Sequence, residues 1–264
     1  MPETKISKER YLSVVMPAYN EEATLAQIVD KVLELDFLLE LIIVDDCSKD
    51  KTPEIAAALV ARDERVRYVR QERNGGKTEA LKTGFGLTKG EVVIVQDADL
   101  EYDPGEIADV VMPIATGRAD VVYGSRFMVK KAARVLYFYH YLANKGLTFL
   151  SNCLTNLNMT DVETCYKAFR GEIIRNMTIT SRGFGFEIEV TAKVAKLRCA
   201  VYEVPISYYG RTYEEGKKIG FRDGVAALGY ILKYNWLTDL KSSYREIPRD
   251  SLVEKPHLLA ATNE

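Results

Sequence analysis

Short apolar runs alternate with segments of helical periodicity along the first half of this chain. Such alternation is typical of a largely parallel sheet covered by helices on both faces, because each helix returns the chain to the same end of the sheet. We therefore expect an α/β fold with a mostly parallel sheet flanked by helices. The expected strands cover residues 11–16, 41–44, 66–69, 91–96 and 120–123, and the expected helices cover residues 25–33, 53–61 and 77–87.

Length and composition fit one large domain. The chain has 264 residues, of which 47% are hydrophobic, and this is enough for a substantial core. A formal net charge of −2 disfavours a general nucleic-acid binder, so we expect no nucleic-acid partner. The four cysteines form no closely spaced zinc or redox pair, and a reducing, cytoplasmic compartment suits them. We expect a polar N-terminal segment over residues 1–10, one domain over 11–240 and a polar tail over 241–264.

Polar residues follow three of the expected strands. Ligands of open parallel sheets bind outside the carboxyl ends of the strands, so these loops are where a site should form. No GxGxxG motif follows the first strand, which disfavours a dinucleotide site. The three loops are Pro-Ala-Tyr-Asn-Glu at 17–21, Asp-Asp-Cys-Ser at 45–48 and Asp-Ala-Asp at 97–99.

The loop after the fourth strand predicts a metal site. In extended backbone, alternate residues share one side, so Asp97, Asp99 and Glu101 can face the same pocket. Mg²⁺ or Mn²⁺ prefers oxygen ligands and is usually bound by one or two carboxylates together with substrate phosphates. The pattern therefore favours a diphosphate-bearing substrate. The alternative is a pair of aspartates that merely ends a strand.

Two aromatic segments, residues 134–154 and 221–237, are candidate membrane-interface helices. Aromatic side chains suit the headgroup level of a bilayer, and neighbouring Lys and Arg suit anionic lipid. A core helix or a dimer helix is the alternative for each segment. No apolar run reaches the roughly 18 residues that a spanning helix needs, so we expect contact with a membrane from one side only.

Several short motifs occur together in a fixed order. They are Met-Pro-Ala-Tyr-Asn-Glu-Glu at 16–22, Val-Asp-Asp-Cys-Ser at 44–48, Asn-Gly-Gly-Lys at 74–77, Asp-Ala-Asp at 97–99 and Gly-Ser-Arg at 124–126. In this order they resemble the inverting GT-A glycosyltransferases of family 2, and within them the dolichol-phosphate mannose synthase and polyprenyl-phosphate glycosyltransferase group. The resemblance runs from about Tyr11 to Tyr234. The chain departs from the group at Glu101, where some relatives have glutamine, and at Thr78, where relatives often have glycine.

The resemblance implies roles for individual residues. Asp97, Asp99 and Glu101 would bind Mg²⁺ or Mn²⁺, and Asp97, Asp99 and Arg126 would be the catalytic residues. The nucleotide sugar would contact Pro17, Ala18, Tyr19, Glu21, Asp46, Lys77, Asp97, Ala98 and Asp99. The acceptor phosphate would contact Ser125, Arg126, Arg134, Arg211 and Lys217.

The implied reaction moves a hexose from a nucleotide sugar to a polyprenyl phosphate on the cytoplasmic face of a membrane. A UDP-hexose is preferred over GDP-mannose as the donor, and a separate membrane-anchoring subunit is a further possible partner. An acceptor hydroxyl, on a lipid or a glycan, would instead require a general base. A non-catalytic nucleotide-sugar-binding partner and a nucleotidyltransferase are the remaining alternatives. The base candidates are Asp161, Glu163, Glu187 and Glu189.

Overall fold

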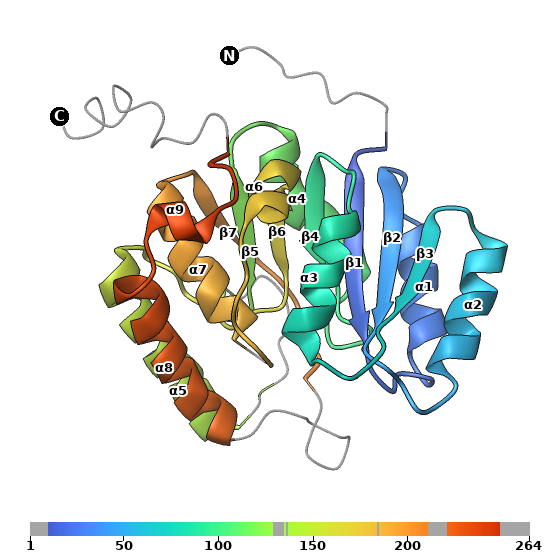
Figure 1. Ribbon diagram of the computed structural model, residues 1–264, viewed down its shortest axis with the longest axis horizontal. Coiled ribbons are helices and arrows are strands. Elements are labelled where there is room, and N and C mark those ends of the chain that lie inside the picture. Colours follow the sequence, from blue (N-terminus) through green and yellow to red (C-terminus); the bar gives the residue numbers. More distant parts are fainter. Residues whose placement is uncertain (1–9, 129–134, 136, 184, 211–220, 249–264) are drawn as a thin grey trace.

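A seven-stranded sheet forms the centre of the molecule, with helices on both of its faces (Figure 1). The computed structural model describes residues 10–128, 135, 137–183, 185–210 and 221–248. The strand order is β3-β2-β1-β4-β6-β5-β7. The strands are β1 (Leu12–Ala18), β2 (Leu38–Asp45), β3 (Val66–Arg70), β4 (Val92–Val95), β5 (Val121–Ser125), β6 (Lys167–Arg170) and β7 (Val201–Pro205).

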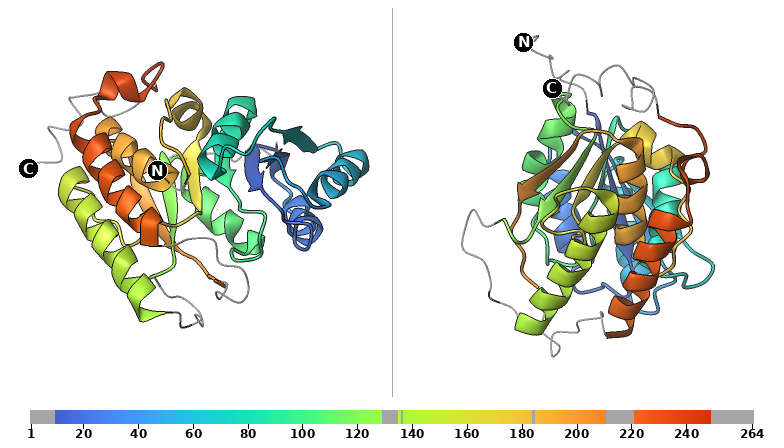
Figure 2. Two further views of the ribbon diagram at one scale, coloured as in Figure 1. Left: turned by 60° about the horizontal axis from the view of Figure 1, so that its bottom comes forward. Right: turned by 90° about the vertical axis from the view of Figure 1, so that its left-hand side faces the viewer.

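Helices cover both faces of the sheet, and α5 (Phe138–Thr155) and α8 (Phe221–Trp236) lie beyond one side of it (Figure 1 and Figure 2). All helices expected from the first half of the sequence are confirmed, each within a residue or two of its expected bounds. They are α1 (Leu25–Leu33), α2 (Thr52–Arg62), α3 (Lys77–Leu87), α4 (Ile107–Ala115), α5 (Phe138–Thr155), α6 (Gly171–Asn176), α7 (Phe186–Leu197), α8 (Phe221–Trp236) and α9 (Leu240–Ser243), with a 3-10 turn η1 (Pro104–Glu106) before α4.

The sheet is mostly parallel, as expected, with one exception. β1 pairs in parallel with β2 and β4, β2 with β3, and β5 with β7. β6 lies between β4 and β5 and is antiparallel to both. No signal in the sequence predicted β6, which joins the strands β3, β2, β1 and β4 on one side to β5 and β7 on the other.

Close helix packing on the sheet explains a glycine inside α3. A Cβ on Gly84 would lie 2.3 Å from Cγ1 of Val15, so only glycine lets α3 approach β1 this closely. On the other face, α1 buries Leu25, Ile28 and Val32 completely, at helical spacing. Each such side chain contributes roughly 1.5–3 kcal/mol through burial, which holds α1 against the core.

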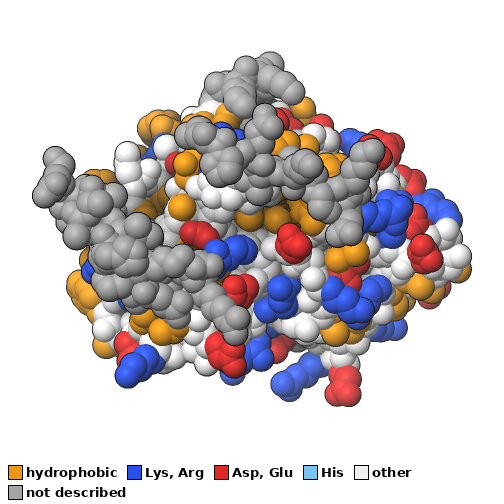
Figure 3. Space-filling view, turned by 90° about the horizontal axis from the view of Figure 1, so that it is seen from above, with side chains coloured by type: hydrophobic (Ala, Val, Ile, Leu, Met, Phe, Trp, Pro, Cys, Tyr) orange, Lys and Arg blue, Asp and Glu red, His pale blue; other side chains and the backbone are white. Residues whose placement is uncertain are grey.

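The carboxyl ends of β1, β2 and β4 meet at one edge of the sheet, the lower edge in Figure 1. The expected polar loops therefore come together there. The opposite end of the molecule is seen from above in Figure 3, where the described residues in view include both basic and acidic side chains.

The aromatic segments form α5 and α8, which lie side by side at the far end of the molecule from α2 (Figure 2). α5 is continuous through Asn144, Lys145 and Gly146, and the Lys145 ammonium points inward, donating to the Thr160 carbonyl at 3.1 Å. Within the described part of the chain, no helix has the length and apolarity to cross a membrane.

The first residues of the expected C-terminal tail are packed against the domain. α9 is followed by an antiparallel bridge between Met177 and Tyr244, and Arg245 N–H donates to the Asn176 carbonyl at 2.8 Å. Tyr244 is buried and belongs to the hydrophobic core. The chain from Leu240 to Arg245 therefore contacts the domain. Residues 1–9 and 249–264 lie outside the described residues.

Candidate functional site

Asp97 and Asp99 lie in the loop immediately after β4, where the sheet ends. Asp97 is paired with Lys77, whose Nζ is 3.0 Å from both carboxylate oxygens. Asp99 Oδ1 accepts a hydrogen bond from the Glu101 N–H at 3.1 Å, which turns the chain out of the strand direction. Both aspartates are partly exposed, whereas Ala98 between them is buried. Leu100 and Glu101 are also partly exposed, and the chain bends beyond Ala98, so the segment is not a simple continuation of the strand.

The Gly75–Gly76 turn brings Lys77 to the aspartates, and Asp46 holds that turn. The Gly75 and Gly76 N–H groups each donate to the Asp46 carboxylate at 2.7 Å. Gly76 has φ +84°, a conformation that other residues rarely adopt, and α3 begins at the next residue. Asp46 was expected to contact the nucleotide. In this structure its carboxylate is buried and fixes the loop that presents Lys77.

The loop after β1 forms the neighbouring wall. Glu21 N–H donates to the Thr52 hydroxyl at 2.9 Å, and Thr24 donates to the Glu21 carboxylate at 3.1 Å. Ala18 and Glu21 are buried, while Pro17 and Tyr19 are half-buried. The four residues expected to line a nucleotide therefore lie at the same sheet edge as Asp97. Tyr19 is the largest of their side chains and is partly exposed.

Lys77 lies between two carboxylates. Its Nζ is 3.4 Å from Glu187 Oε1, at the start of α7, in addition to its contacts with Asp97. Burial alone would lower the pKa of the Lys77 ammonium, but the charges of Asp97 and Glu187 outweigh burial and hold that pKa well above its usual value. Lys77 is therefore a cation at any physiological pH, aimed at the aspartate loop.

Arg126 is the second buried cation of the site, and Asp161 orients it. Arg126 Nε and Nη2 donate to the two Asp161 oxygens at 2.7 and 2.8 Å, a bidentate pair. Asp161 is fully buried, and although burial would raise its pKa, Arg126 holds that pKa below the usual value. No hydrogen bond from Arg126 Nη1 occurs within the described part of the chain. A guanidinium fixed through Nε and Nη2 leaves Nη1 as the nitrogen that can donate to a ligand.

Ser125 supports the Arg126 loop. Its side chain is completely buried, its hydroxyl lies 2.6 Å from the Thr160 hydroxyl, and the Phe127 N–H donates to it at 3.2 Å. Ser125 was expected at the acceptor phosphate, but these contacts occupy it in the structure. The other expected acceptor residues, Arg134, Arg211 and Lys217, lie outside the described residues.

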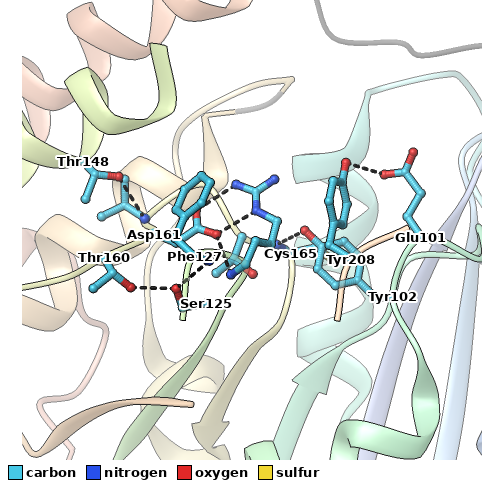
Figure 4. Close-up of polar contacts among 12 residues, drawn as sticks. Glu101, Tyr102, Ser125, Phe127, Thr148, Thr160, Asp161, Cys165 and Tyr208 are labelled. Atoms are coloured by element: carbon cyan, nitrogen blue, oxygen red, sulfur yellow. Dashed lines mark hydrogen bonds and ion pairs between the residues drawn. The ribbon is translucent and has the colours of Figure 1, made fainter. Parts of the chain in front are cut away.

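Tyr208 connects the aspartate loop to Arg126 (Figure 4). Its hydroxyl donates to Glu101 Oε2 at 2.9 Å, and its ring lies 5.2 Å from the Arg126 guanidinium carbon. Glu101, expected as a metal ligand, is therefore turned toward Tyr208. Among the described residues, no group of three or more His, Cys, Asp or Glu side chains could hold a metal ion by itself. Asp97 and Asp99 remain the two oxygen donors that a cation and a diphosphate could share.

Sequence reasoning did not single out Tyr208, Tyr102 or Cys165. Tyr102 packs against the Tyr208 ring at a centroid distance of 5.3 Å, and its hydroxyl accepts the Cys165 N–H at 3.1 Å. Burial, and then the negative charge of Asp97, raise the pKa of the Cys165 thiol, which keeps it neutral beside the aspartate. Only the closeness in sequence of Tyr208 to Arg211, one of the expected acceptor residues, could have drawn attention to one of these residues.

The remaining carboxylates suggested as bases, Glu189 and Glu163, differ in their hydrogen bonding. Glu189 accepts from the Thr180 and Ser181 N–H groups at 2.7–3.0 Å and from Lys193 at 2.6 Å. Glu163 differs, because its Oε1 is buried and has no hydrogen-bond partner among the described residues. Burial, followed by the charge of Glu187, raises the pKa of Glu163 to about 7.

Glu163 should make the stability of the protein depend on pH. Its pKa rises from 4.5 to about 7 on folding, so its contribution is most favourable below about pH 4.5 and is lost as the pH rises through 7. We expect Glu163→Gln to raise the free energy of unfolding by roughly 1–3 kcal/mol at pH 8, and by much less at pH 5. Urea unfolding at both pH values measures this, with the exposed Glu54→Gln as control. An equal gain at both pH values would contradict the assignment.

Residues 13–178 match the family model described as glycosyl transferase family 2. The chain belongs to this family. It is a family 2 glycosyltransferase of the dolichol-phosphate mannose synthase group, as the ordered motifs indicated. An undecaprenyl-phosphate mannosyltransferase of Micrococcus luteus is 30% identical over 216 residues, covering 78% of this chain and 86% of that protein. A polyprenol monophosphomannose synthase of Mycolicibacterium smegmatis is 29% identical, covering 78% of this chain and 80% of that protein.

The fold matches solved structures of another protein. Glucosyl-3-phosphoglycerate synthase of Mycobacterium tuberculosis, crystallised with Mn²⁺ and UDP-glucose, superimposes with a TM-score of 0.68 and 22% identity. The match covers 87% of this chain and 80% of that protein. The GT-A fold expected from the sequence is therefore confirmed for this family 2 glycosyltransferase.

Proposed function

We propose that this glycosyltransferase moves a hexose from a nucleotide-diphosphate sugar to a polyprenyl phosphate at a membrane surface, with inversion at the anomeric carbon. Its relatives support this acceptor class, since they are named as enzymes that transfer mannose to undecaprenyl or polyprenyl phosphates. The observation that carries the proposal is the Arg126–Asp161 pair. It fixes a guanidinium beside the aspartate loop, where an acceptor phosphate must meet the donor.

The donor side suits a nucleoside diphosphate and a divalent cation. Asp97 and Asp99 supply two carboxylates at a strand end, the number with which Mg²⁺ is usually held when substrate phosphates complete its coordination. When bound, such an ion offsets the negative charge that develops on the departing diphosphate. Lys77 would add a second positive charge to the same leaving group. The Mn²⁺ and UDP-glucose of the structural neighbour support a UDP-hexose donor, whereas the names of the relatives favour mannose.

The acceptor side needs no proton acceptor if the nucleophile is a phosphate. A phosphate monoester is largely dianionic at neutral pH, because its second pKa is about 6. Arg126 would orient this dianion for in-line attack on the anomeric carbon, and a single displacement inverts the configuration. Asp161, the base candidate nearest to Arg126, is a poor proton acceptor because Arg126 occupies both of its oxygens and lowers its pKa. This observation favours a phosphate over a hydroxyl acceptor.

A donor and acceptor panel tests the proposal. Purified protein is incubated with Mn²⁺ and radiolabelled UDP-glucose, UDP-galactose, GDP-mannose or other nucleotide sugars, with a short polyprenyl phosphate or the matching polyprenol. We expect transfer that requires both the metal and the phosphate group, and nuclear magnetic resonance of the product should show inversion. Transfer to the polyprenol alone would replace the phosphate acceptor with a hydroxyl acceptor. Binding of nucleotide sugar without transfer to any acceptor would favour a non-catalytic partner.

The exposed aromatic side chains of α5 and α8 should hold the protein at a bilayer. Phe149 and Trp236 are each 69% exposed, as large apolar side chains at a membrane interface would be. We expect the double variant Phe149→Ser/Trp236→Ser to bind anionic phosphatidylglycerol vesicles about tenfold or more weakly in flotation at low salt. The control is Val60→Ser/Met112→Ser, which removes apolar side chains exposed elsewhere. Absence of wild-type binding would instead favour a separate membrane-anchoring subunit.

A further inference from the structure

Lys77 forms an ion pair with Asp97, one of the two carboxylates proposed to bind the metal ion. Its ammonium is 3.0 Å from both oxygens of Asp97, so the pair is closed in the structure. Only 17% of the Lys77 side chain and 19% of the Asp97 side chain are exposed, which shields the pair from water and strengthens it. A divalent cation binds carboxylate oxygens at roughly 2.1 Å, and an ammonium that contacts both oxygens of Asp97 competes with it for that negative charge. Cation binding at Asp97 is therefore favoured when Lys77 moves to another carboxylate.

Glu187 offers Lys77 an alternative partner. Its Oε1 is already 3.4 Å from Nζ of Lys77, and its Oε2 is buried without a hydrogen-bond partner among the described residues. Glu187 lies in the first turn of α7, a helix whose side chains are almost all buried, so its position is fixed. A buried ammonium that lost its only carboxylate would be strongly disfavoured. With Glu187 present, Lys77 can leave Asp97 and keep a negative partner.

We infer that Lys77 and Glu187 form a metal-responsive pair: Lys77 neutralises Asp97 in the absence of a divalent cation, and Glu187 receives Lys77 when the cation takes Asp97. This inference rests on the proposed metal site at Asp97 and Asp99. In its second position Lys77 remains next to the loop where the donor diphosphate binds. Glu187 is thus a positioning residue that acts through Lys77, rather than the general base that a hydroxyl acceptor would require.

The inference predicts opposite effects of two variants on the binding of Mn²⁺ alone. Removing the competing ammonium with Lys77→Met should tighten Mn²⁺ binding about tenfold. Glu187→Gln should weaken it about three- to tenfold, because Lys77 then has Asp97 as its one remaining carboxylate. In the Lys77→Met background, Glu187→Gln should have no effect on Mn²⁺. With Mn²⁺ saturating, both single variants should weaken UDP binding, since Lys77 is absent or misplaced.

Electron paramagnetic resonance of free Mn²⁺ measures these affinities without any turnover. Lys82→Met is the matched control, because Lys82 lies on the same helix but pairs with Glu79 at 2.8 Å, away from Asp97. Thermal unfolding checks that each variant is folded, and Lys77→Gln replaces Lys77→Met if the latter is not.

Each outcome decides between distinct possibilities. Equal effects of Glu187→Gln with and without Lys77 would mean a structural role and would overturn the inference. If Glu187→Gln loses turnover while its Mn²⁺ and UDP binding are unchanged, Glu187 acts as a general base, and the inference is overturned. If the wild-type protein binds Mn²⁺ but Lys77→Met does not bind it more tightly, the inference fails while the proposed metal site stands. If neither wild type nor Lys77→Met binds Mn²⁺, with or without UDP, the metal site of the proposed function fails as well.

Discussion

Replacing Asp99 with alanine should abolish almost all sugar transfer while leaving the fold intact. Asp99 lies in a partly exposed loop beyond β4, and its carboxylate is one of the two proposed metal donors, the other being Asp97, which pairs with Lys77. Loss of one of two protein ligands should remove several kcal/mol of charge stabilisation from the departing diphosphate. We therefore expect kcat/KM to fall about 10³-fold, and Mn²⁺ binding to weaken with it. Initial rates over a range of Mn²⁺ concentrations measure both effects.

Two further variants make this prediction specific. Asp99→Asn keeps the size of the side chain and the oxygen that accepts the Glu101 N–H, so it separates loss of charge from loss of loop geometry. Asp109→Ala removes an exposed carboxylate from α4 and should leave the rate unchanged. Activity of Asp99→Ala within tenfold of wild type, at any Mn²⁺ concentration, would remove Asp99 from the proposed metal site.

The first half of the fold could be predicted because its signals are local. Apolar runs such as Val92–Val95 and helical spacing in α1 each identify an element without reference to the rest of the chain. β6 gave no such signal. It has four residues, begins with Lys167 and ends with Arg170, and its place between β4 and β5 is decided by tertiary pairing. Lys167 is completely buried there, which a local pattern would have argued against.

The location of the site could be predicted, but the partners of its side chains could not. Parallel strands end at one edge of a sheet, so the loops containing Tyr19, Asp46 and Asp97 had to lie close together. The contacts among them depend on segments distant in the sequence. Asp161 was considered as a base and proves to orient Arg126, and Glu187 proves to lie beside Lys77. Such pairings follow from the packing of α7 and the chain before β6, which no spacing rule encodes.

Replacing Arg126 should separate acceptor binding from donor binding. Its guanidinium is held by two hydrogen bonds to a fully buried carboxylate and lies over the ring of Tyr208. We expect Arg126→Ala to lower kcat/KM for the polyprenyl phosphate about 10³-fold, because a charge-assisted phosphate contact in a shielded site is lost. The affinity for nucleotide sugar should change little. Initial rates with varied acceptor, together with calorimetric titration of UDP, distinguish the two effects.

The same substitution should destabilise the protein, because it leaves Asp161 buried without its cation. Removing one partner of a buried ion pair costs about 3–5 kcal/mol. Arg126→Lys retains a positive charge near Asp161 but loses the paired hydrogen bonds, so it should recover most of the stability and little of the activity. Arg170→Ala is the matched control: it breaks an Arg–Asp pair with Asp120, 3.0 Å long, at the opposite end of β5.

The pH dependence of Arg126→Lys then identifies the acceptor chemistry. If the nucleophile is a phosphate dianion, wild type and variant should both gain activity as the pH rises through about 6 and then level off, because the acceptor itself titrates. If the nucleophile is a hydroxyl, the profile follows a carboxylate of the protein instead. In that case Arg126→Lys should shift the profile, since Arg126 is what lowers the pKa of Asp161. A profile that moves with the residue at position 126 would contradict the phosphate mechanism; one that does not move would support Arg126 as a phosphate-binding residue.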